Sequence, residues 1–293
     1  MCEIVGHRGA RGEMPENTLA GFAHCFKMGL QAIEMDVHLT ADGQVVVCHD
    51  PRPRPALTRN ADGQWIDADP PLIVCTPLAE LKQYDVGGAR PGSADAAQFP
   101  GQAVLSGERI PTLEEVLKLA VTSGPAVRLV IEIKSDPTDS VQATAALGCA
   151  EAVAGLLRGH PLSRLAVVES FDWAVMARLR DAAPELSRGY LTCTGMARKG
   201  GATYYEGSPW LAGRHDADPV ALVAAEGGQF WGPWCGDVDA GAVTAARKAG
   251  LGVIVWTANS DDEIARLASL GVDGIVTDYP TRAQRILARS RPD

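Results

Sequence analysis

Short apolar runs alternate with segments of helical periodicity along almost the whole chain, and this alternation restricts the possible folds more than any other feature. Eight of the runs have the length and composition of buried strands. They are Glu3–Gly6, Ala32–Val37, Arg128–Ile133, Leu165–Glu169, Arg188–Thr192, Gln229–Trp231, Gly252–Trp256 and Gly274–Thr277. The helical segments lie at about 17–29, 112–122, 139–158, 172–182, 217–226, 238–249, 260–270 and 280–290.

Local signals mark where several of these helices begin and end. The pairs Thr112/Glu115 and Ser260/Glu263 fit the capping box, Asn17 or Thr18 could cap the first helix, and Gly250 and Gly271 stand where helices should stop. Eight strands alternating with eight helices in 293 residues predict a (β/α)8 TIM barrel. A doubly wound open sheet is the alternative.

Two segments are too long for the loops of a minimal barrel. Residues 51–108 follow the second strand, are rich in Pro, Gly, Asp and Ala, and predict one short helix near Pro77–Tyr84. We expect one domain over residues 1–293, with 51–108 as an inserted segment or subdomain. The second segment, 193–216, is Gly-rich and carries Arg198, Lys199, Tyr204, Tyr205 and Trp210. Each segment could be a lid and substrate wall, or a mobile loop that packs its own aromatic side chains.

The stretch from Ile33 to Asp50 has the pattern of a β-hairpin. Its first half alternates with a period of two, which places Glu34, Asp36 and His38 on one face of a strand. Asp42-Gly43 between two strand-like runs predicts a two-residue turn. That turn would pair Thr40 with Val45, His38 with Val47 and Asp36 with His49. The hairpin therefore predicts an imidazole beside two carboxylates.

Two carboxylates on one face repel each other and lose hydration unless a cation lies between them. Hard oxygen ligands suit Mg²⁺ or Ca²⁺ better than Zn²⁺. For an isolated Glu-x-Asp pair, a solvated, exposed hairpin would be the better explanation, so the prediction of a metal site depends on the rest of the chain.

Composition excludes several classes of protein. A net charge of −9 argues against a nucleic-acid surface, although one local Arg and Lys can still bind an anionic substrate. Seven scattered cysteines without a C-x-x-C motif indicate reduced thiols. With no apolar run of membrane-spanning length and a strand expected from residue 3, we expect a cytoplasmic protein without stable membrane insertion. The oligomeric state stays open.

In a barrel enzyme, the residues that carry the chemistry follow the carboxyl ends of the strands. Applied to this chain, the rule selects His7, Arg8, Glu34, Asp36, His49, Glu132 and Lys134, and it also selects Glu169-Ser170, Trp256-Thr257 and Thr277-Asp278. Glu34, Asp36 and Glu132 would hold a metal ion. Arg8 and Lys134 suit a phosphate, and His7 and His49 suit proton transfer. Together these groups favour phosphodiester cleavage over other reaction classes.

The same residues lie within motifs that resemble the glycerophosphodiester phosphodiesterase family. The motifs are His7-Arg8-Gly9-Ala10, Pro15-Glu16-Asn17-Thr18, Glu34-x-Asp36-Val37-x-x-Thr40-x-Asp42-Gly43, His49-Asp50, Ile110-Pro111-Thr112-Leu113, Glu132-Ile133-Lys134, Ser170-Phe171-Asp172, Trp256-Thr257-x-Asn259 and Gly271-Val272-Asp273-Gly274-Ile275-Val276-Thr277-Asp278. They follow one another in order over nearly the whole chain. The chain departs from the pattern after His49-Asp50, where it continues Pro51-Arg52-Pro53-Arg54-Pro55.

The resemblance implies a TIM barrel that hydrolyses glycerophosphodiesters to an alcohol and glycerol 3-phosphate. It also implies Mg²⁺ or Ca²⁺ on the residues matching Glu34, Asp36 and Glu132, an acid–base pair at His7 and His49, and phosphate contacts from Arg8 and Lys134. We favour His7 as the base and His49 as the acid. Water or the neighbouring glycerol hydroxyl would be the nucleophile.

Other polar and aromatic residues have weaker assignments. Trp256 could form the apolar wall against the glycerol carbons or pack as a rim aromatic. Glu16, Asn17 and Asn259 are expected to be structural, with Glu16 as a candidate pocket residue. His38 is expected to have no direct role, and His24, His160 and His215 are expected at the surface or in packing.

Three other functions use the same kind of barrel. A phospholipase-D-like or cyclising enzyme acting on lipids would need an exposed apolar rim. A non-catalytic phosphodiester-binding protein would lack one of the seven polar groups, and an isomerase acting on sugar phosphates would have a Gly-rich phosphate loop after its last strands.

Overall fold

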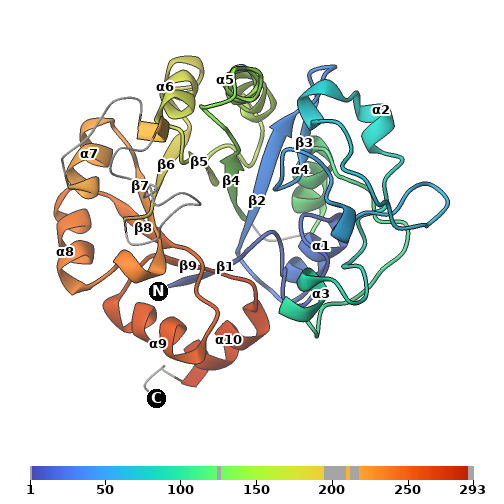
Figure 1. Cartoon of the computed structure of the whole chain (residues 1–293). Helices are drawn as coiled ribbons and strands as arrows, with labels where there is room; N and C mark the ends of the chain where they lie inside the picture. Colours follow the sequence, from blue (N-terminus) through green and yellow to red (C-terminus); the bar gives the residue numbers. More distant parts are fainter. Residues whose placement is uncertain (1, 124–126, 195–208, 212–217, 290–293) are drawn as a thin grey trace.

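In the computed structural model, which describes residues 2–123, 127–194, 209–211 and 218–289, eight parallel strands close into a barrel (Figure 1). They are β1 (Glu3–Gly6), β2 (Ala32–Leu39), β4 (Arg128–Ile133), β5 (Ala166–Ser170), β6 (Ser187–Thr192), β7 (Phe230–Pro233), β8 (Gly252–Val255) and β9 (Gly274–Thr277). Strand β1 pairs with β9 on one side and with β2 on the other. The predicted barrel is therefore confirmed, and the open sheet is excluded.

A ring of helices surrounds the strands (Figure 1). They are α1 (Leu19–Lys27), α4 (Leu113–Thr122), α5 (Ser140–Leu157), α6 (Trp173–Ala182), α7 (Pro219–Ala225), α8 (Ala240–Lys248), α9 (Asp261–Leu270) and α10 (Pro280–Arg289). Both predicted capping boxes are present, at Thr112 and Ser260, and Thr18 is the residue that caps α1. Gly271 ends α9 in the left-handed conformation, as its position predicted.

Side chains of the barrel strands alternate between two cores. The apolar residues that point outward, such as Ile33, Met35 and Val37 on β2, pack against the helices. A separate small cluster fills the barrel itself, formed by Val5, Ala32, Val130, Ile254 and Val276 with Phe230 and Trp256. Because this cluster closes the barrel below, the polar side chains nearer the carboxyl ends of the strands line a cavity with a floor.

The hairpin after β2 forms, but its register differs by one residue from the prediction. Strand β3 (Val45–Val47) is antiparallel to β2, and it pairs Val37 with Val47, His38 with Val46 and Leu39 with Val45. The predicted pairs Thr40–Val45, His38–Val47 and Asp36–His49 are therefore wrong.

A longer turn explains the shift. Thr40 donates its backbone N–H to the carbonyl of Gln44, so the turn contains three residues instead of two. Gly43 takes the left-handed conformation (φ 75°) that a three-residue turn of this kind requires. As a result, His49 lies beyond the paired strand and reaches the site from a loop.

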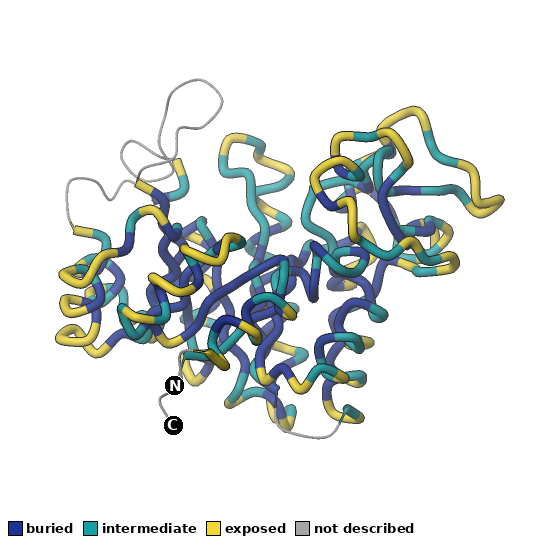
Figure 2. The backbone as a smooth tube through the Cα atoms, turned by 90° about the horizontal axis from the view of Figure 1, so that it is seen from below, coloured by how far each residue is buried: buried dark blue, intermediate teal, exposed yellow. Residues whose placement is uncertain are grey.

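The chain between β3 and α4 forms a lobe on one side of the barrel, with an exposed outer loop (Figure 2). It contains η1 (Pro55–Leu57), η2 (Ile73–Cys75), α2 (Leu78–Leu81) and α3 (Ala94–Gln98). Helix α2 confirms the short helix predicted near Pro77–Tyr84. A small core of Val46, Ile73, Leu81 and Ile110 holds the lobe against the barrel. Asp85 organises its interior by accepting hydrogen bonds from the backbone N–H groups of Gly87 and Gly107 and from Arg59.

The segment predicted as a second lid lies mostly outside the described residues, including Arg198, Lys199, Tyr204, Tyr205 and His215. The part that is described includes η3 (Pro209–Leu211). A further short helix, η4 (Cys235–Asp237), follows β7.

No two cysteines in the described part of the chain form a disulfide. Among the described residues, α5 alone is long and apolar enough to cross a membrane, a weak signal that core helices of soluble proteins also give.

Candidate active site

A cavity of about 800 Å³ lies at the carboxyl ends of the barrel strands. Of the eight residues predicted for the site, seven line it: His7, Arg8, Glu34, His49, Glu132, Lys134 and Trp256. The eighth, Asp36, is buried and contacts Arg8 and Lys134. Residues from four barrel strands (β1, β2, β4 and β8) or the loops that follow them, together with His49 from the loop after β3, therefore meet at one place.

Three carboxylates form the centre of this cavity. Glu34 and Asp36 are only 3% and 1% exposed, and the register of β2 and β4 sets Asp36 beside Glu132. Each of the three offers an oxygen within 4.8 Å of the others. Oxygen Oε1 of Glu34 is buried without a hydrogen-bond partner among the described residues. Carboxylate oxygens gathered in this way, one of them unpartnered, fit a hard divalent cation.

The acids affect one another's ionisation. Burial, with the charges of Asp36 and Glu132, raises the pKa of Glu34 well above its ordinary value. Burial also raises the pKa of Glu132. Although burial favours its neutral form, Lys134 and Arg8 hold the pKa of Asp36 well below the ordinary range. The site thus contains more acids than its two cations can keep ionised.

Those two cations are the predicted phosphate ligands. The ammonium of Lys134 lies 2.9 Å from Oδ1 of Asp36 and 2.7 Å from Oε1 of Glu132. Nε of Arg8 lies 3.2 Å from Oδ2 of Asp36, and its Nη1 donates to Oε1 of Glu16 at 3.0 Å. Both side chains pair with the acids and also line the cavity, where an anion could contact them.

The loop after β1 holds Arg8 in an unusual backbone conformation. Arg8 and Asn17 both have positive φ values, 50° and 54°, which cost about 1–3 kcal/mol for residues other than glycine. Three hydrogen bonds compensate. Arg8 N–H donates to Oε2 of Glu34, Asn17 N–H donates to the carbonyl of Arg8, and Nδ2 of Asn17 donates to Oδ2 of Asp36. Asn17 is therefore structural, as expected, but it orients a predicted metal ligand instead of capping α1.

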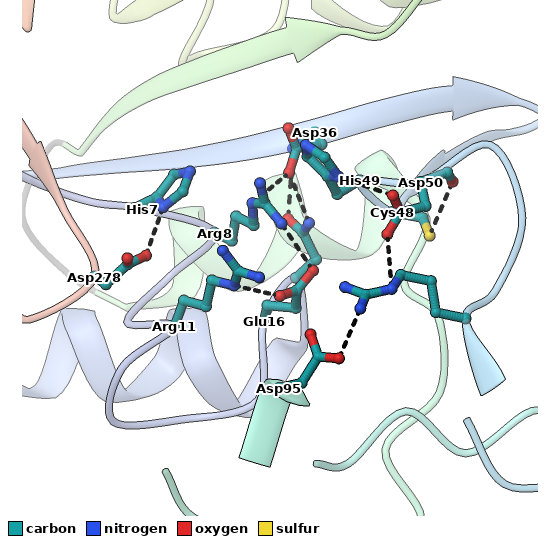
Figure 3. Close-up of polar contacts among 12 residues, drawn as sticks. His7, Arg8, Arg11, Glu16, Asp36, Cys48, His49, Asp50, Asp95 and Asp278 are labelled. Carbon is teal, nitrogen blue, oxygen red and sulfur yellow. Dashed lines mark hydrogen bonds and ion pairs between the residues drawn. The ribbon is translucent and has the colours of Figure 1, made fainter. Parts of the chain in front are cut away.

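His7 is oriented by Asp278 (Figure 3), which is itself held by Asn259. Its Nδ1 lies 2.6 Å from Oδ1 of Asp278, and its Nε2 lies 3.9 Å from Glu34. Nδ2 of Asn259 donates to Oδ2 of Asp278 at 2.6 Å, while its Oδ1 accepts from the Asp278 N–H. Although burial opposes ionisation, the charge and hydrogen bond of His7 lower the pKa of Asp278. His7 therefore keeps Nε2 available to the cavity.

His49 lies beside Asp36, on the side away from His7 (Figure 3). Its Nδ1 lies 3.3 Å from Oδ1 of Asp50, and its backbone carbonyl accepts a hydrogen bond from Nε2 of His38. Burial and the positive charges of Lys134 and Arg8 lower the pKa of His49 to about 4. Burial also lowers the pKa of His38 to about 4, which keeps it neutral and able to donate that hydrogen bond.

One family of known proteins matches the chain over nearly its whole length. The model of the glycerophosphoryl diester phosphodiesterase family matches residues 7–282, from His7 to just beyond Asp278. This chain belongs to that family.

Relatives and solved structures of this phosphodiesterase family agree with the fold. The chain is 32% identical over 279 residues to the YhdW protein of Bacillus subtilis, with 94% of each chain covered. A glycerophosphoryl diester phosphodiesterase from Silicibacter pomeroyi, known from a crystal structure, is 38% identical in sequence. Its structure matches this one with a TM-score of 0.88 over 99% of this chain and 94% of that chain. A phosphodiesterase from Oleispira antarctica, solved with the product sn-glycerol-3-phosphate, is 25% identical with a TM-score of 0.73, covering 98% and 96%.

One wall of the cavity in this family member is aromatic. Trp256 lines the cavity, and its Nε1 donates to the carbonyl of Gly232 at 2.8 Å, which holds the indole in place. Phe171 packs edge-on against Trp256, with ring centroids 5.3 Å apart, and Trp210 lies 6.1 Å beyond Phe171. Trp256 thus has the position predicted for a substrate wall and also packs with the barrel core.

The lobe between β3 and α4 supports another part of the cavity wall (Figure 3). Arg54 pairs with both Asp50, next to His49, and Asp95 of α3. Arg11 donates to Oε2 of Glu16 and stacks on Phe99, at the end of α3. Residues of the lobe therefore hold the loops that carry Arg8 and His49.

Sequence reasoning missed the roles of four residues. Asp278 and Asn259 orient His7, Arg11 forms a second guanidinium in the cavity wall, and Glu169 is a fourth buried carboxylate there. Asp278 and Glu169 both follow the rule that selected the other residues, since each stands at or just after the end of a barrel strand. Arg11 had no such signal, because it stands several residues beyond the end of β1 and its aromatic partner, Phe99, comes from the lobe.

Proposed function

We propose that this chain hydrolyses glycerophosphodiesters to an alcohol and glycerol 3-phosphate, using a divalent cation and two histidines. The observation that supports this proposal most is the meeting of three acids, two imidazoles and two fixed cations in one floored cavity. The product held by the Oleispira antarctica relative, sn-glycerol-3-phosphate, is the phosphate product of this reaction.

Glu34, Asp36 and Glu132 are the residues that would hold the cation, Mg²⁺ or Ca²⁺. The unpartnered Oε1 of Glu34 and the raised pKa of Glu34 and Glu132 indicate acids that lack sufficient positive charge. A bound cation would supply Lewis-acid stabilisation of phosphate charge. Arg8 and Lys134 would bind phosphate oxygens, because both side chains pair with Asp36 and also line the cavity.

His7 is the proposed base. The hydrogen bond to Asp278 holds its proton on Nδ1, which leaves the Nε2 lone pair free to accept a proton from the nucleophile. The nucleophile is water or the neighbouring glycerol hydroxyl, and a cyclic phosphate intermediate distinguishes the second from the first.

His49 is the proposed acid, and it would give its proton to the departing alcohol. With a pKa of about 4 it is neutral in the free protein, and the charges of Lys134 and Arg8 are part of the cause. A phosphate bound to those two cations would offset their charge and so raise the pKa of His49. His49 would thus be protonated more readily when a substrate is bound.

The test uses three substrates and three metal conditions. The protein is incubated with glycerophosphocholine, glycerophosphoethanolamine or bis(p-nitrophenyl) phosphate, in Mg²⁺, Ca²⁺ or EDTA, and the products are identified by phosphorus NMR. We expect glycerol 3-phosphate from the two glycerol substrates and no turnover in EDTA. Full turnover in EDTA, or a cyclic phosphate as the final product, would contradict the proposal.

A further inference from the structure

Glu169, at the end of β5, is a buried carboxylate for which the proposed mechanism has no use. It is 4% exposed, lines the cavity, and stands beside Glu132 in the β4–β5 register. Among the described residues it makes no hydrogen bond and no ion pair, and Glu34, Asp36 and Glu132 already supply the three metal ligands. Burying this acidic group without a protein partner is costly, so its place on the cavity wall points to a ligand that makes hydrogen bonds with it.

The neighbouring strands leave room for this side chain. A Cβ atom at Gly189 of β6 would lie 3.1 Å from Oε2 of Glu169, and one at Gly232 of β7 would lie 3.7 Å from the same oxygen. The carboxylate therefore extends over two positions that have no side chain. The space at these two glycines lets the side chain of Glu169 extend toward β6 and β7.

The surroundings of Glu169 restrict what can bind there. Leu191, Trp256 and Val276 line the same cavity with apolar surface, and the core cluster of the barrel closes the cavity below. The ligand group that reaches this closed end must be small, must have apolar C–H surface to pack against these side chains, and must donate hydrogen bonds. A vicinal diol meets all three conditions, whereas a quaternary ammonium group has no N–H to donate.

We propose that Glu169 forms a subsite for the two hydroxyls of the glycerol half of the substrate, and that it selects glycerol phosphates over alkyl phosphates of the same length. The proposal rests on the proposed function and adds the residue that recognises the constant half of the substrate. The variable alcohol would then lie toward the open side of the cavity, near His49.

The test compares two phosphates that differ only in their hydroxyls. sn-Glycerol 3-phosphate and propyl phosphate compete with bis(p-nitrophenyl) phosphate, whose hydrolysis does not need a glycerol group. Hydrogen bonds from the two hydroxyls together correspond to roughly ten- to hundredfold in affinity. We therefore expect the wild-type protein to bind glycerol 3-phosphate at least about tenfold more tightly than propyl phosphate.

Substitution should remove this preference without weakening the binding of propyl phosphate. In Glu169→Leu we expect the ratio of the two inhibition constants to fall close to one, and in Glu169→Gln to an intermediate value. Asp136→Asn is the matched control, because Asp136 lines the same cavity but its carboxylate is satisfied by Thr138. A wild-type ratio near one, or an unchanged ratio in both Glu169 variants, would overturn the proposal.

Two further measurements distinguish a diol subsite from a fourth metal ligand and from a failure of the proposed function. Calorimetric titration with Mg²⁺ should give the same affinity for the wild type and Glu169→Gln, and a tenfold loss would make Glu169 a metal ligand and overturn the proposal. If the wild type hydrolyses none of the phosphodiesters, the proposed function fails. Direct titration with the two phosphates then still decides whether Glu169 recognises the diol.

Discussion

Replacing Asp278 with Asn tests how the site controls the tautomer of His7. The amide of Asn259 has a fixed orientation, since its Oδ1 accepts from the Asp278 backbone N–H and its Nδ2 donates to Oδ2 of Asp278. An amide at position 278 must therefore point its own NH₂ group either at Nδ2 of Asn259 or at Nδ1 of His7. The first choice sets two donors against each other. The second moves the His7 proton to Nε2 and removes the proposed base.

The size of the effect follows from the contact that is lost. The Asp278–His7 hydrogen bond is 2.6 Å long and involves a charged acceptor, so it contributes about 1.5–3 kcal/mol. Since 1.36 kcal/mol corresponds to a factor of ten in rate, we expect kcat to fall roughly 10- to 150-fold. KM should change little, because neither residue is expected to bind the phosphate. Initial rates of glycerophosphocholine hydrolysis measure both constants, and nitrogen NMR of the imidazole reports the tautomer.

A second substitution can restore the original pattern of donors and acceptors. In Asp278→Asn/Asn259→Asp, the new carboxylate at 259 accepts from the amide at 278, which leaves the amide oxygen to accept from Nδ1 of His7. We expect this double variant to regain at least about tenfold in kcat over Asp278→Asn. If Asp278→Asn keeps more than half of the wild-type kcat, or if the double variant is no faster than the single one, the reasoning is wrong.

Further predictions concern the acids, the pH dependence and the stability of the fold. Glu34→Gln should lower metal-dependent kcat by at least about a hundredfold. The same substitution should raise the thermal stability of the metal-free protein at pH 7, as measured by calorimetry, because burial and the acidic neighbours of Glu34 disfavour its ionised carboxylate. Burial and Glu132 raise the pKa of Glu169 from 4.5 to about 8. The metal-free protein should therefore lose stability as pH rises between these values, by up to about 1.4 kcal/mol per pH unit from this group. Urea unfolding in EDTA should show that the free energy of unfolding depends less steeply on pH in Glu169→Gln than in the wild type. Ser260→Ala removes the N-cap of α9 and should cost about 0.5–2 kcal/mol in the same unfolding experiment, without changing KM. Asp85→Ala should make the lobe between β3 and α4 sensitive to limited proteolysis while leaving the barrel resistant, because three hydrogen bonds within the lobe end on that carboxylate.

The barrel could be predicted from the sequence because its signals are local and repeat eight times. Strand alternation and two capping boxes located elements such as β4 and α9 to within about one residue of their observed ends. The carboxyl-end rule then brought distant residues together, since parallel strands in a barrel share one rim. Because the positions of His7 and Glu132 follow from this topology, they were predicted without knowledge of any side-chain contact.

What sequence patterns could not supply depends on tertiary contacts. The hairpin register was wrong by one residue, because Asp42-Gly43 is compatible with both a two-residue and a three-residue turn. The lobe was predicted only at α2, since its interior is organised by Asp85 and not by periodic apolar residues. The orientation of His7 depends on Asp278, and no periodicity relates residues that lie 271 positions apart.

The place of β1 between β9 and β2 determines when activity can appear during synthesis and folding. His7 leaves the ribosome 271 residues before its partner Asp278. Until β9 docks beside β1, the imidazole lacks the carboxylate that sets its proton. Chains that terminate before Asp278 should therefore be catalytically inert even when most of the barrel helices have formed.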